Sequence, residues 1–351
     1  MASIRDVARA AGVSPATVSN VLNGRTEKVS PETRDRVLAT VRELRYRPTA
    51  LEHRQKAILT QNLGVMVSDL TEGPLVRHGY FRNVLDGVLE GAALKGWSLT
   101  IFVQRMWYDV GQAVRRSYDG RCDALVMVAP QPGNEVVQLL SERGTPLVFI
   151  GSTPWVSGIS LVDLDNEAVG REAARHLVGL KHRRLAYIGY ENEQVSSVER
   201  REAFFREAAE LGIPATQVHW VRVARIGEDA SFDGELAVRQ VLSMRSAPTG
   251  LFAWHDGLAG PLVQELMRFG RRVPEDFSVI SVDDAPEALD VSPKLTTFSN
   301  PLHDIGRRAA TMIIDRLTEG TEGVEFIRFS PRLILRESTG NAPFPSAVAD
   351  R

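Results

Sequence analysis

The sequence predicts an α/β protein: an N-terminal all-α helix-turn-helix head, followed by a larger core of two lobes built on doubly wound parallel sheets. The head is predicted from short helical patterns separated by glycine, serine and proline within the first 48 residues. The core is predicted from two successive series of apolar strand patterns that alternate with amphipathic helical patterns. A chain of 351 residues is also too long for one ordinary hydrophobic core.

The head begins with apolar residues at helical spacing over residues 4–11. Gly12 follows them and tolerates the positive φ of a tight turn. Ser14 then suits an N-cap, and Pro15 suits the first helical position, where no amide hydrogen is needed. A second serine-proline start at residues 30–31 predicts a third helix. Two helices joined by such a turn form a helix-turn-helix, whose second helix enters the major groove of DNA.

Charge is distributed unevenly along the chain. Residues 1–60 hold 11 Lys+Arg and 6 Asp+Glu, a net of +5, so within a total of −2 the remainder carries −7. A basic head on an acidic body fits a head that meets a polyphosphate. The second helix would also expose hydroxyls and amides that suit phosphate oxygens, and asparagine pairs with the edge of adenine. These features favour DNA binding over the alternative, a three-helix domain with polar solvent faces.

The head resembles that of the lactose/galactose repressor (LacI/GalR) family over about 45 ungapped residues. The matching segments are 3–24 and 29–48. By that resemblance Pro15, Ala16 and Asn20 read bases, whereas Thr17, Ser19 and Asn23 hold the DNA backbone. The candidate DNA-binding residues of the head are Ser14, Pro15, Ala16, Thr17, Ser19, Asn20 and Asn23.

Asn20 departs from the family, which usually has arginine at this position. Arginine reads guanine and asparagine prefers adenine, so we expect an operator half-site that differs from the common family site.

Residues 49–62 correspond to the family's hinge, which forms a short helix on operator DNA in a dimer. There a leucine from each subunit wedges into the minor groove and kinks it. In this sequence the wedge position is Gln55, and Glu52 stands where alanine is usual. We expect either that the DNA is bent less or that Leu51 or Leu59 takes the place of the wedge. The alternative is that this segment is a plain linker.

The core begins with strand candidates at the positions 63–67, 99–103, 124–128 and 146–150, and continues with 185–190, 218–223, 250–254 and 279–282. Helical patterns lie between them at 84–94, 135–143, 167–180, 200–211 and 257–268. Ligands of doubly wound sheets bind beyond the carboxyl ends of the strands. A cleft between the two lobes is therefore the expected ligand site.

The core also resembles that of the same family, which is built like periplasmic sugar-binding proteins, up to about residue 340. The resemblance lies in residues 162–166, 180–189, 200–204, 273–284 and 295–297. It implies a DNA-binding domain at 1–48, a hinge at 49–62, a two-lobed periplasmic-binding-protein-like core at 63–340 and a tail at 341–351. The first lobe would comprise about 63–160 and 295–325, and the second about 161–294 and 326–340.

By position in the family, the candidate effector-binding residues are Tyr80, Phe81, Asp165, Arg200, His255, Asp256 and Asp283. Carboxylates and an arginine can bracket the hydroxyls of a sugar, while aromatic faces cover its C–H face. Each residue has a structural alternative. Asp165 and Asp283 are also suited to capping helices, Arg200 to a surface ion pair, and the two aromatic residues to the core.

Several departures leave the ligand open. Gly151 stands where many family members carry an aspartate, and His255 replaces an asparagine. About five extra residues lie within 70–79, and Trp155 and Trp254 follow strands at the expected cleft. An unusual sugar, a glycoside and a non-sugar ligand all fit these features.

The sequence therefore predicts a sequence-specific DNA-binding repressor whose operator affinity is controlled by a small molecule, and a sugar or sugar derivative is the expected ligand. A homodimer on a palindromic operator is expected, since symmetric readers mirror operator symmetry. The tail has no leucine heptads, which disfavours a coiled-coil tetramer. The alternative is a DNA-binding regulator whose core only dimerises and has lost effector control.

Other function classes are disfavoured. The sequence has no G-x-S-x-G, P-loop or G-x-G-x-x-G motif, and its 7 histidines form no metal-spaced pair, so neither an enzyme, a cofactor nor a metal is expected. The single cysteine, Cys122, forms no internal disulfide and is expected to be a small semi-buried residue. No signal peptide or membrane-spanning run is recognisable, which predicts a cytoplasmic protein rather than a secreted solute-binding protein or a membrane protein.

Overall fold

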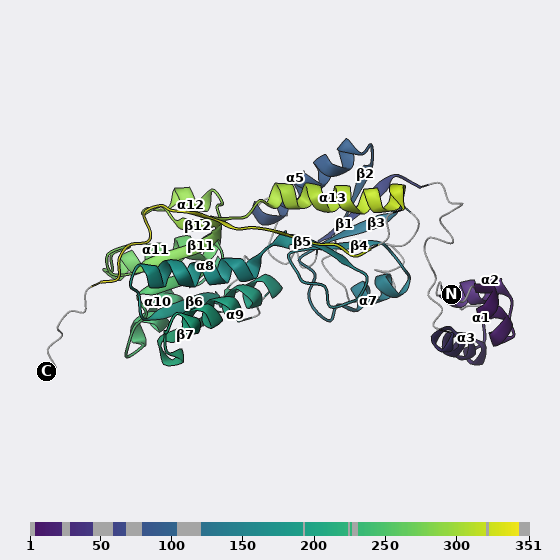
Figure 1. Ribbon diagram of the computed structural model, residues 1–351, viewed down its shortest axis with the longest axis horizontal. Coiled ribbons are helices and arrows are strands. Elements are labelled where there is room, and N and C mark those ends of the chain that lie inside the picture. The colour runs from purple at the N-terminus through teal and green to yellow at the C-terminus, as the bar shows by residue number, and fades with distance from the viewer. Residues whose placement is uncertain are drawn as a thin grey trace.

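The computed structural model contains a three-helix head and a core of two sheet-based lobes (Figure 1). The predicted fold class is confirmed by these elements. The structure describes residues 4–22, 29–44, 59–67, 79–103, 121–191, 194–223, 225–226, 231–320 and 323–343.

The head consists of α1 (Ile4–Ala11), α2 (Pro15–Leu22) and α3 (Pro31–Glu43). The predicted N-caps form, because the hydroxyl of Ser14 accepts from the amide of Thr17 at 3.1 Å and that of Ser30 from the amide of Thr33 at 3.3 Å. Gly12 adopts φ +64° between the first two helices. The apolar faces meet in a buried cluster of Val7, Ala8, Ala11, Val18, Val21 and Val37.

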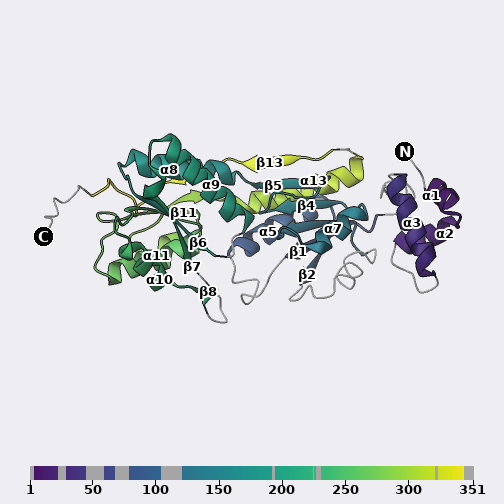
Figure 2. The same cartoon turned by 90° about the horizontal axis from the view of Figure 1, so that it is seen from below.

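The first lobe is built on a six-stranded sheet in the order β13-β5-β4-β3-β1-β2, with all neighbours parallel. Its strands are β1 (Asn62–Val67), β2 (Ser98–Val103), β3 (Ala124–Val128), β4 (Leu147–Ile150), β5 (Ser160–Leu164) and β13 (Phe326–Phe329). The helices α5 (Gly79–Leu94) and α13 (Leu302–Glu319) lie side by side over it (Figures 1 and 2). On the other face, α7 (Glu135–Glu142) contributes to a second apolar cluster, against which Cys122 is half-buried.

The second lobe is built on a sheet in the order β14-β12-β11-β10-β6-β7, in which only β14 runs antiparallel to its neighbour. Its strands are β6 (Leu185–Tyr190), β7 (Val218–Val223), β10 (Gly250–Ala253), β11 (Ser278–Asp283), β12 (Thr296–Ser299) and β14 (Arg332–Ile334). Its helices are α8 (Asn166–Gly179), α9 (Val195–Glu210), α10 (Gly234–Ser243), α11 (Asp256–Arg268) and the short α12 (Glu287–Asp290). A 3-10 turn at Ala215–Gln217 and a two-stranded hairpin of β8 (Arg225–Ile226) and β9 (Ser231–Phe232) complete the lobe.

The chain crosses between the lobes three times, between β5 and α8, between β12 and α13, and between β13 and β14. Each crossing comes a few residues later than the predicted lobe boundaries. β5 and β13 belong to the first sheet, and β12 belongs to the second. The reason is that each of these strands stays paired within its sheet to its last residue, so the lobe changes where the strand ends. The remaining domain boundaries stay predictions.

The C-terminal segment is fastened to the second lobe by His182, a fully buried residue. Its Nδ1 lies 2.9 Å from the Thr249 hydroxyl, and its Nε2 lies 2.9 Å from that of Ser278 and 3.1 Å from the carbonyl oxygen of Gly340. Burial lowers the pKa of His182 to about 4, which keeps the ring neutral around pH 7. Within the described part of the chain, no helix combines the length and the hydropathy needed to cross a membrane.

Candidate functional site

The second helix of the head presents the predicted DNA-reading positions to solvent. Pro15, Ala16 and Asn20 are exposed, and Thr17 and Ser19 are half-buried. Val18 and Val21 face the three-helix cluster, so the helix is fixed on one side and free to meet a groove on the other.

Three of the predicted DNA contacts, Asn23, Leu51 and Gln55, lie outside the described residues. Leu59 is described and packs, partly buried, against the main apolar cluster of the core. A partly buried side chain is less accessible as a minor-groove wedge, and the expectation that Leu59 takes that place stays a prediction. Leu51 stays a prediction for that role.

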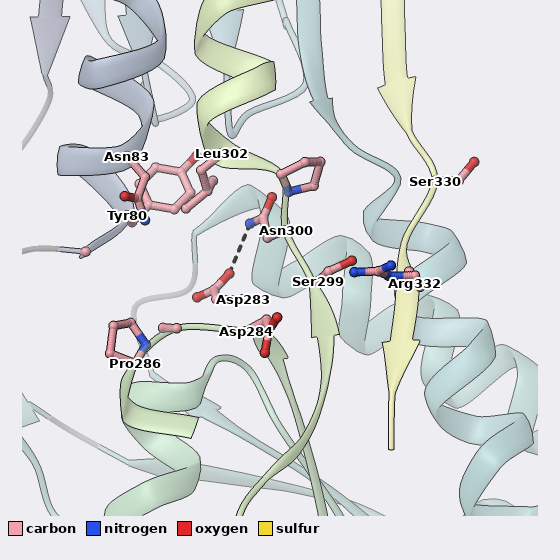
Figure 3. Close-up of a pocket in the computed structure, with 13 residues that line it drawn as sticks. Tyr80, Asn83, Asp283, Asp284, Pro286, Ser299, Asn300, Leu302, Ser330 and Arg332 are labelled. Atoms are coloured by element: carbon pink, nitrogen blue, oxygen red, sulfur yellow. Dashed lines mark hydrogen bonds between the residues drawn. The ribbon is translucent and has the colours of Figure 1, made fainter. Parts of the chain in front are cut away.

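A cavity of about 480 Å³ lies where the two lobes and the crossing segments meet (Figure 3). The start of α5 supplies one wall, the turn after β11 supplies another, and two of the three crossings supply the rest. The lining residues are Gly79, Tyr80, Asn83, Asp283, Asp284, Ala285, Pro286, Ser299, Asn300, Pro301, Leu302, Ser330 and Arg332. The cavity therefore lies beyond the carboxyl ends of parallel strands, as expected of this architecture.

Tyr80 and Asp283 are the two predicted effector residues that line this cavity. Tyr80 comes from the first turn of α5 in the first lobe, and Asp283 ends β11 in the second. Burial raises the pKa of the Tyr80 hydroxyl well above its usual value, and the carboxylates of Asp163 and Asp283 raise it further. The hydroxyl therefore stays protonated and can donate a hydrogen bond.

Asp283 and Asp284 form a turn in which both residues have positive φ, +117° and +53°. Asn300 donates from Nδ2 to the Asp283 carboxylate at 3.0 Å (Figure 3). Burial raises the pKa of Asp283, whereas the positive charge of Arg200 lowers it. Asp284 is ion-paired with Arg336 instead. The two neighbouring carboxylates thus differ, one bonded to a neutral amide and one bonded to a guanidinium.

Arg200 is buried behind the cavity wall and is not a surface ion-pair residue. Its Nε donates to the Asn166 side chain at 2.9 Å, and its Nη1 donates to the carbonyl oxygen of Trp254 at 2.7 Å. Gly170 on α8 makes this depth possible, because a Cβ there would collide with the backbone of α9 at Arg200. Arg200 therefore connects the start of α8 to the end of β10. Its positive charge also stabilises the ionised carboxylate of Asp283.

Asp163, which the sequence analysis did not select, joins this network from β5. Its carboxylate accepts from the side-chain amide of Asn166 at 3.2 Å, within a buried setting. Burial raises the pKa of Asp163 to about 7, against the lowering effect of the Leu164 amide and the Arg200 charge. A buried carboxylate inside a strand has no sequence signature of its own, and only the marked segment 162–166 drew attention to it.

The geometry does not support the prediction that Asp256 contacts the effector. This residue is fully buried, and its carboxylate accepts from the hydroxyls of Ser281 at 2.5 Å and Thr297 at 2.7 Å and from the amide of Ala285 at 2.8 Å. Three donors on one carboxylate leave it engaged within the protein. Asp256 instead fixes the turn that carries Asp283.

Asp165 takes the helix-capping alternative, because its carboxylate accepts from the amide of Ala168 at 2.9 Å at the start of α8. Phe81 is half-buried against the main core cluster, with its ring 5.5 Å from that of Tyr80. Neither residue lines the cavity, so effector contact by either stays a prediction.

His255 belongs to an aromatic group at the ends of β6 and β10. Its ring centroid lies 4.9 Å from Trp254 and 6.3 Å from Tyr190, and the latter two are 5.8 Å apart. Trp155 instead packs against Phe149, at 5.2 Å, in the second cluster of the first lobe. Effector contact by His255 therefore also stays a prediction.

Besides the bond between Asp163 and Asn166, two further side-chain hydrogen bonds join the lobes among the described residues that do not line the cavity. Gln131, just after β3, donates from its side chain to that of Gln194, the N-cap of α9. Thr153, just after β4, donates to the carboxylate of Glu199 on the same helix. The two lobes are thus in direct contact through one helix.

Comparison with known proteins gives family matches for the head and for the core of the chain. Residues 3–49 match the model of bacterial regulatory proteins of the lacI family, and residues 174–339 match the periplasmic binding protein-like domain. The chain is 30% identical over 350 residues to the HTH-type transcriptional repressor PurR of Erwinia tasmaniensis, covering 98% of each chain.

Solved structures agree with this placement. A complex of the transcriptional regulator CelR with cellobiose superimposes with a TM-score of 0.73 at 27% identity, over 96% of this chain and 100% of the other. The lac repressor dimer bound to operator and the anti-inducer ONPF gives 0.66 at 22% identity, over 97% and 99%, and so supports the fold.

Proposed function

Since this chain belongs to the lacI family of bacterial regulatory proteins, we propose that it is a repressor whose operator affinity is set by a small molecule bound between its two lobes. The observation that carries the proposal is the cavity that both lobes line, with Tyr80 on one wall and Asp283 on the other. A ligand that touches both walls necessarily has different affinities for different lobe separations. That difference is what a ligand needs in order to shift a conformational equilibrium.

The path from cavity to DNA runs through the first lobe. Its first strand, β1, starts at Asn62, the last residue of the predicted hinge. A change in lobe orientation therefore acts on the segment from which the head is suspended. In a homodimer on a palindromic operator, two such segments set the spacing of the two heads, and half-site spacing is a geometric requirement for binding.

The ligand that fits best is a carbohydrate. The cavity is lined by polar groups suited to hydroxyls, from Asp283, Ser299, Asn300 and Ser330. The ring of Tyr80 adds an apolar face. The related CelR structure contains cellobiose, which supports a sugar as the ligand of this cavity.

The test combines operator binding with ligand binding on the full-length protein. Operator sites would be selected from random duplex DNA, and operator affinity measured with and without each sugar of a panel that also raises the melting temperature, Tm. We expect one sugar to raise Tm and change operator affinity, and Asp283→Ala to remove both effects. Asn20→Ala is the matched control, since it should weaken operator binding and leave the Tm effect intact. A sugar that binds without changing operator affinity would favour the alternative, a core that only dimerises.

A further inference from the structure

The first-lobe wall of the cavity depends on two residues that lie far apart in the sequence, Tyr80 on α5 and Gly151 just after β4. Gly151 is buried and adopts φ +76°, where a glycine is favoured. A Cβ added at Gly151 would overlap the hydroxyl oxygen of Tyr80, although it would lie 3.5 Å from the ring carbon Cζ, an ordinary contact. The hydroxyl alone therefore fills the space that a side chain at position 151 would need.

We propose that Tyr80 and Gly151 act as one specificity-determining pair, in which the Tyr80 hydroxyl replaces a side chain at position 151 and gives the ligand a hydrogen-bond donor. The inference rests on the proposed effector role of the cavity. Tyr80 lines the cavity, and no described residue forms a hydrogen bond with its hydroxyl. An aspartate at position 151 would instead offer an acceptor at this point.

The opposite wall has the complementary chemistry. Asp283 is a hydrogen-bond acceptor held by Asn300, and its charge acts on the Tyr80 hydroxyl. A ligand that spans the two walls has to accept from Tyr80 and donate to Asp283. Hydroxyl groups do both, so the pair selects a neutral polyhydroxylated ligand. A carboxylate or phosphate could accept from Tyr80 but would bring its negative charge towards Asp283.

The first arm of the experiment measures the pair without any ligand, by thermal unfolding of Gly151→Ala with and without Tyr80→Phe. Gly158→Ala is the matched control, because Gly158 has φ +87° in the same loop but open space around its Cβ. We expect the control to lower Tm by about 2–4 °C through backbone strain alone, and Gly151→Ala by about 6 °C or more through strain and overlap. In the Tyr80→Phe background, the decrease in Tm caused by Gly151→Ala should be no larger than that caused by Gly158→Ala. Equal losses with and without the hydroxyl would overturn the pairing.

The second arm measures ligand binding to the wild type and to Tyr80→Phe with cellobiose, maltose, lactose, glucose, ribose and glucuronate. We expect a neutral sugar to bind the wild type, its Kd to rise by about 3- to 10-fold in Tyr80→Phe, and glucuronate not to bind. Equal affinity for both proteins, binding of glucuronate, or no binding of any of these sugars would overturn the inference. The proposed function is judged separately from operator affinity, because a sugar can bind as expected and leave that affinity unchanged.

Discussion

Asp256→Asn changes a buried charge while keeping the shape of the side chain. The wild-type carboxylate accepts from the Ser281 and Thr297 hydroxyls through Oδ1 and from the Ala285 amide through Oδ2. An asparagine in the same rotamer can accept from Ala285 through its oxygen. Its NH2 group can donate to both hydroxyls, because a hydroxyl accepts as well as donates. The variant therefore keeps all three contacts and loses only the ionisation.

The size of the effect follows from the pKa of Asp256, which is raised from 3.8 to about 7, chiefly by burial and next by the Asp283 charge. A raised pKa means that the folded protein binds this proton more tightly than the unfolded chain does. The stability contributed by the proton is full below about pH 4 and is lost as the pH rises through about 7. At about 1.4 kcal/mol per pKa unit, the loss amounts to about 4 kcal/mol at most. Asparagine does not ionise, so the variant does not lose this stability as the pH rises.

The assay is urea unfolding of the wild type and Asp256→Asn from about pH 5 to about pH 8. We expect the variant to gain on the wild type by about 1.4 kcal/mol per pH unit up to about pH 7, with no further gain above it. Asp163, whose pKa is also about 7, contributes equally to both proteins and cancels in the difference. Asp256→Ala is the control, destabilised at every pH by about 2–5 kcal/mol because its three donors lose their acceptor. Parallel pH curves for the wild type and Asp256→Asn would refute this reasoning.

Further outcomes concern the head, the buried arginine and the lobe contacts. Asn20→Ala should weaken selected-operator binding by about 5- to 150-fold in a fluorescence anisotropy titration; an unchanged affinity would contradict the base-reading role. Arg200→Lys should destabilise the core by about 2–4 kcal/mol in urea unfolding, since one ammonium cannot replace both guanidinium contacts; wild-type stability would contradict that. Joint alanine substitution of Gln131 and Thr153 should widen the ligand-free lobe distribution in small-angle X-ray scattering, whereas Gln138→Ala, on the surface of α7, should leave it unchanged.

The buried strands could be predicted almost residue by residue. The segments 124–128 and 185–190, both fully buried, have the same bounds in the sequence prediction and in the structure. Central parallel strands are covered by helices on both faces, so they appear as continuous apolar runs. The edge strand β13 escaped detection because Phe326 and Arg328 are exposed while Ile327 and Phe329 are only half-buried, a pattern without a continuous apolar run.

The cavity could be predicted only in part, because it is assembled from segments that meet in three dimensions. Tyr80 and Asp283 were found through their places in recognisable segments. Asn83, Asn300 and Arg332 line the cavity because the crossings bring them together, and no spacing in the sequence encodes that meeting.

The hydrogen-bond partners of a buried side chain could not be predicted from the sequence either. Asp256 had the residue type and position of a ligand-binding carboxylate, yet Ser281 and Thr297 turn their hydroxyls towards it from β11 and β12. Those two strands lie next to each other in the sheet, a proximity that only tertiary pairing creates. Asp165 shows the reverse case, since helix capping was a local alternative that the sequence alone could name.

One helix connects the site to the contacts between the lobes. Glu199 and Arg200 are consecutive on α9, and the first bonds Thr153 across the lobe boundary while the second bonds Trp254 within its own lobe. Because Gly170 lets α9 pack directly against α8, the helix cannot move alone without separating that backbone contact. A change in lobe separation that moves α9 with the rest of its lobe would therefore break the bond between Thr153 and Glu199. A bond that is either made or broken gives two discrete arrangements of the lobes, as the proposed effector control requires.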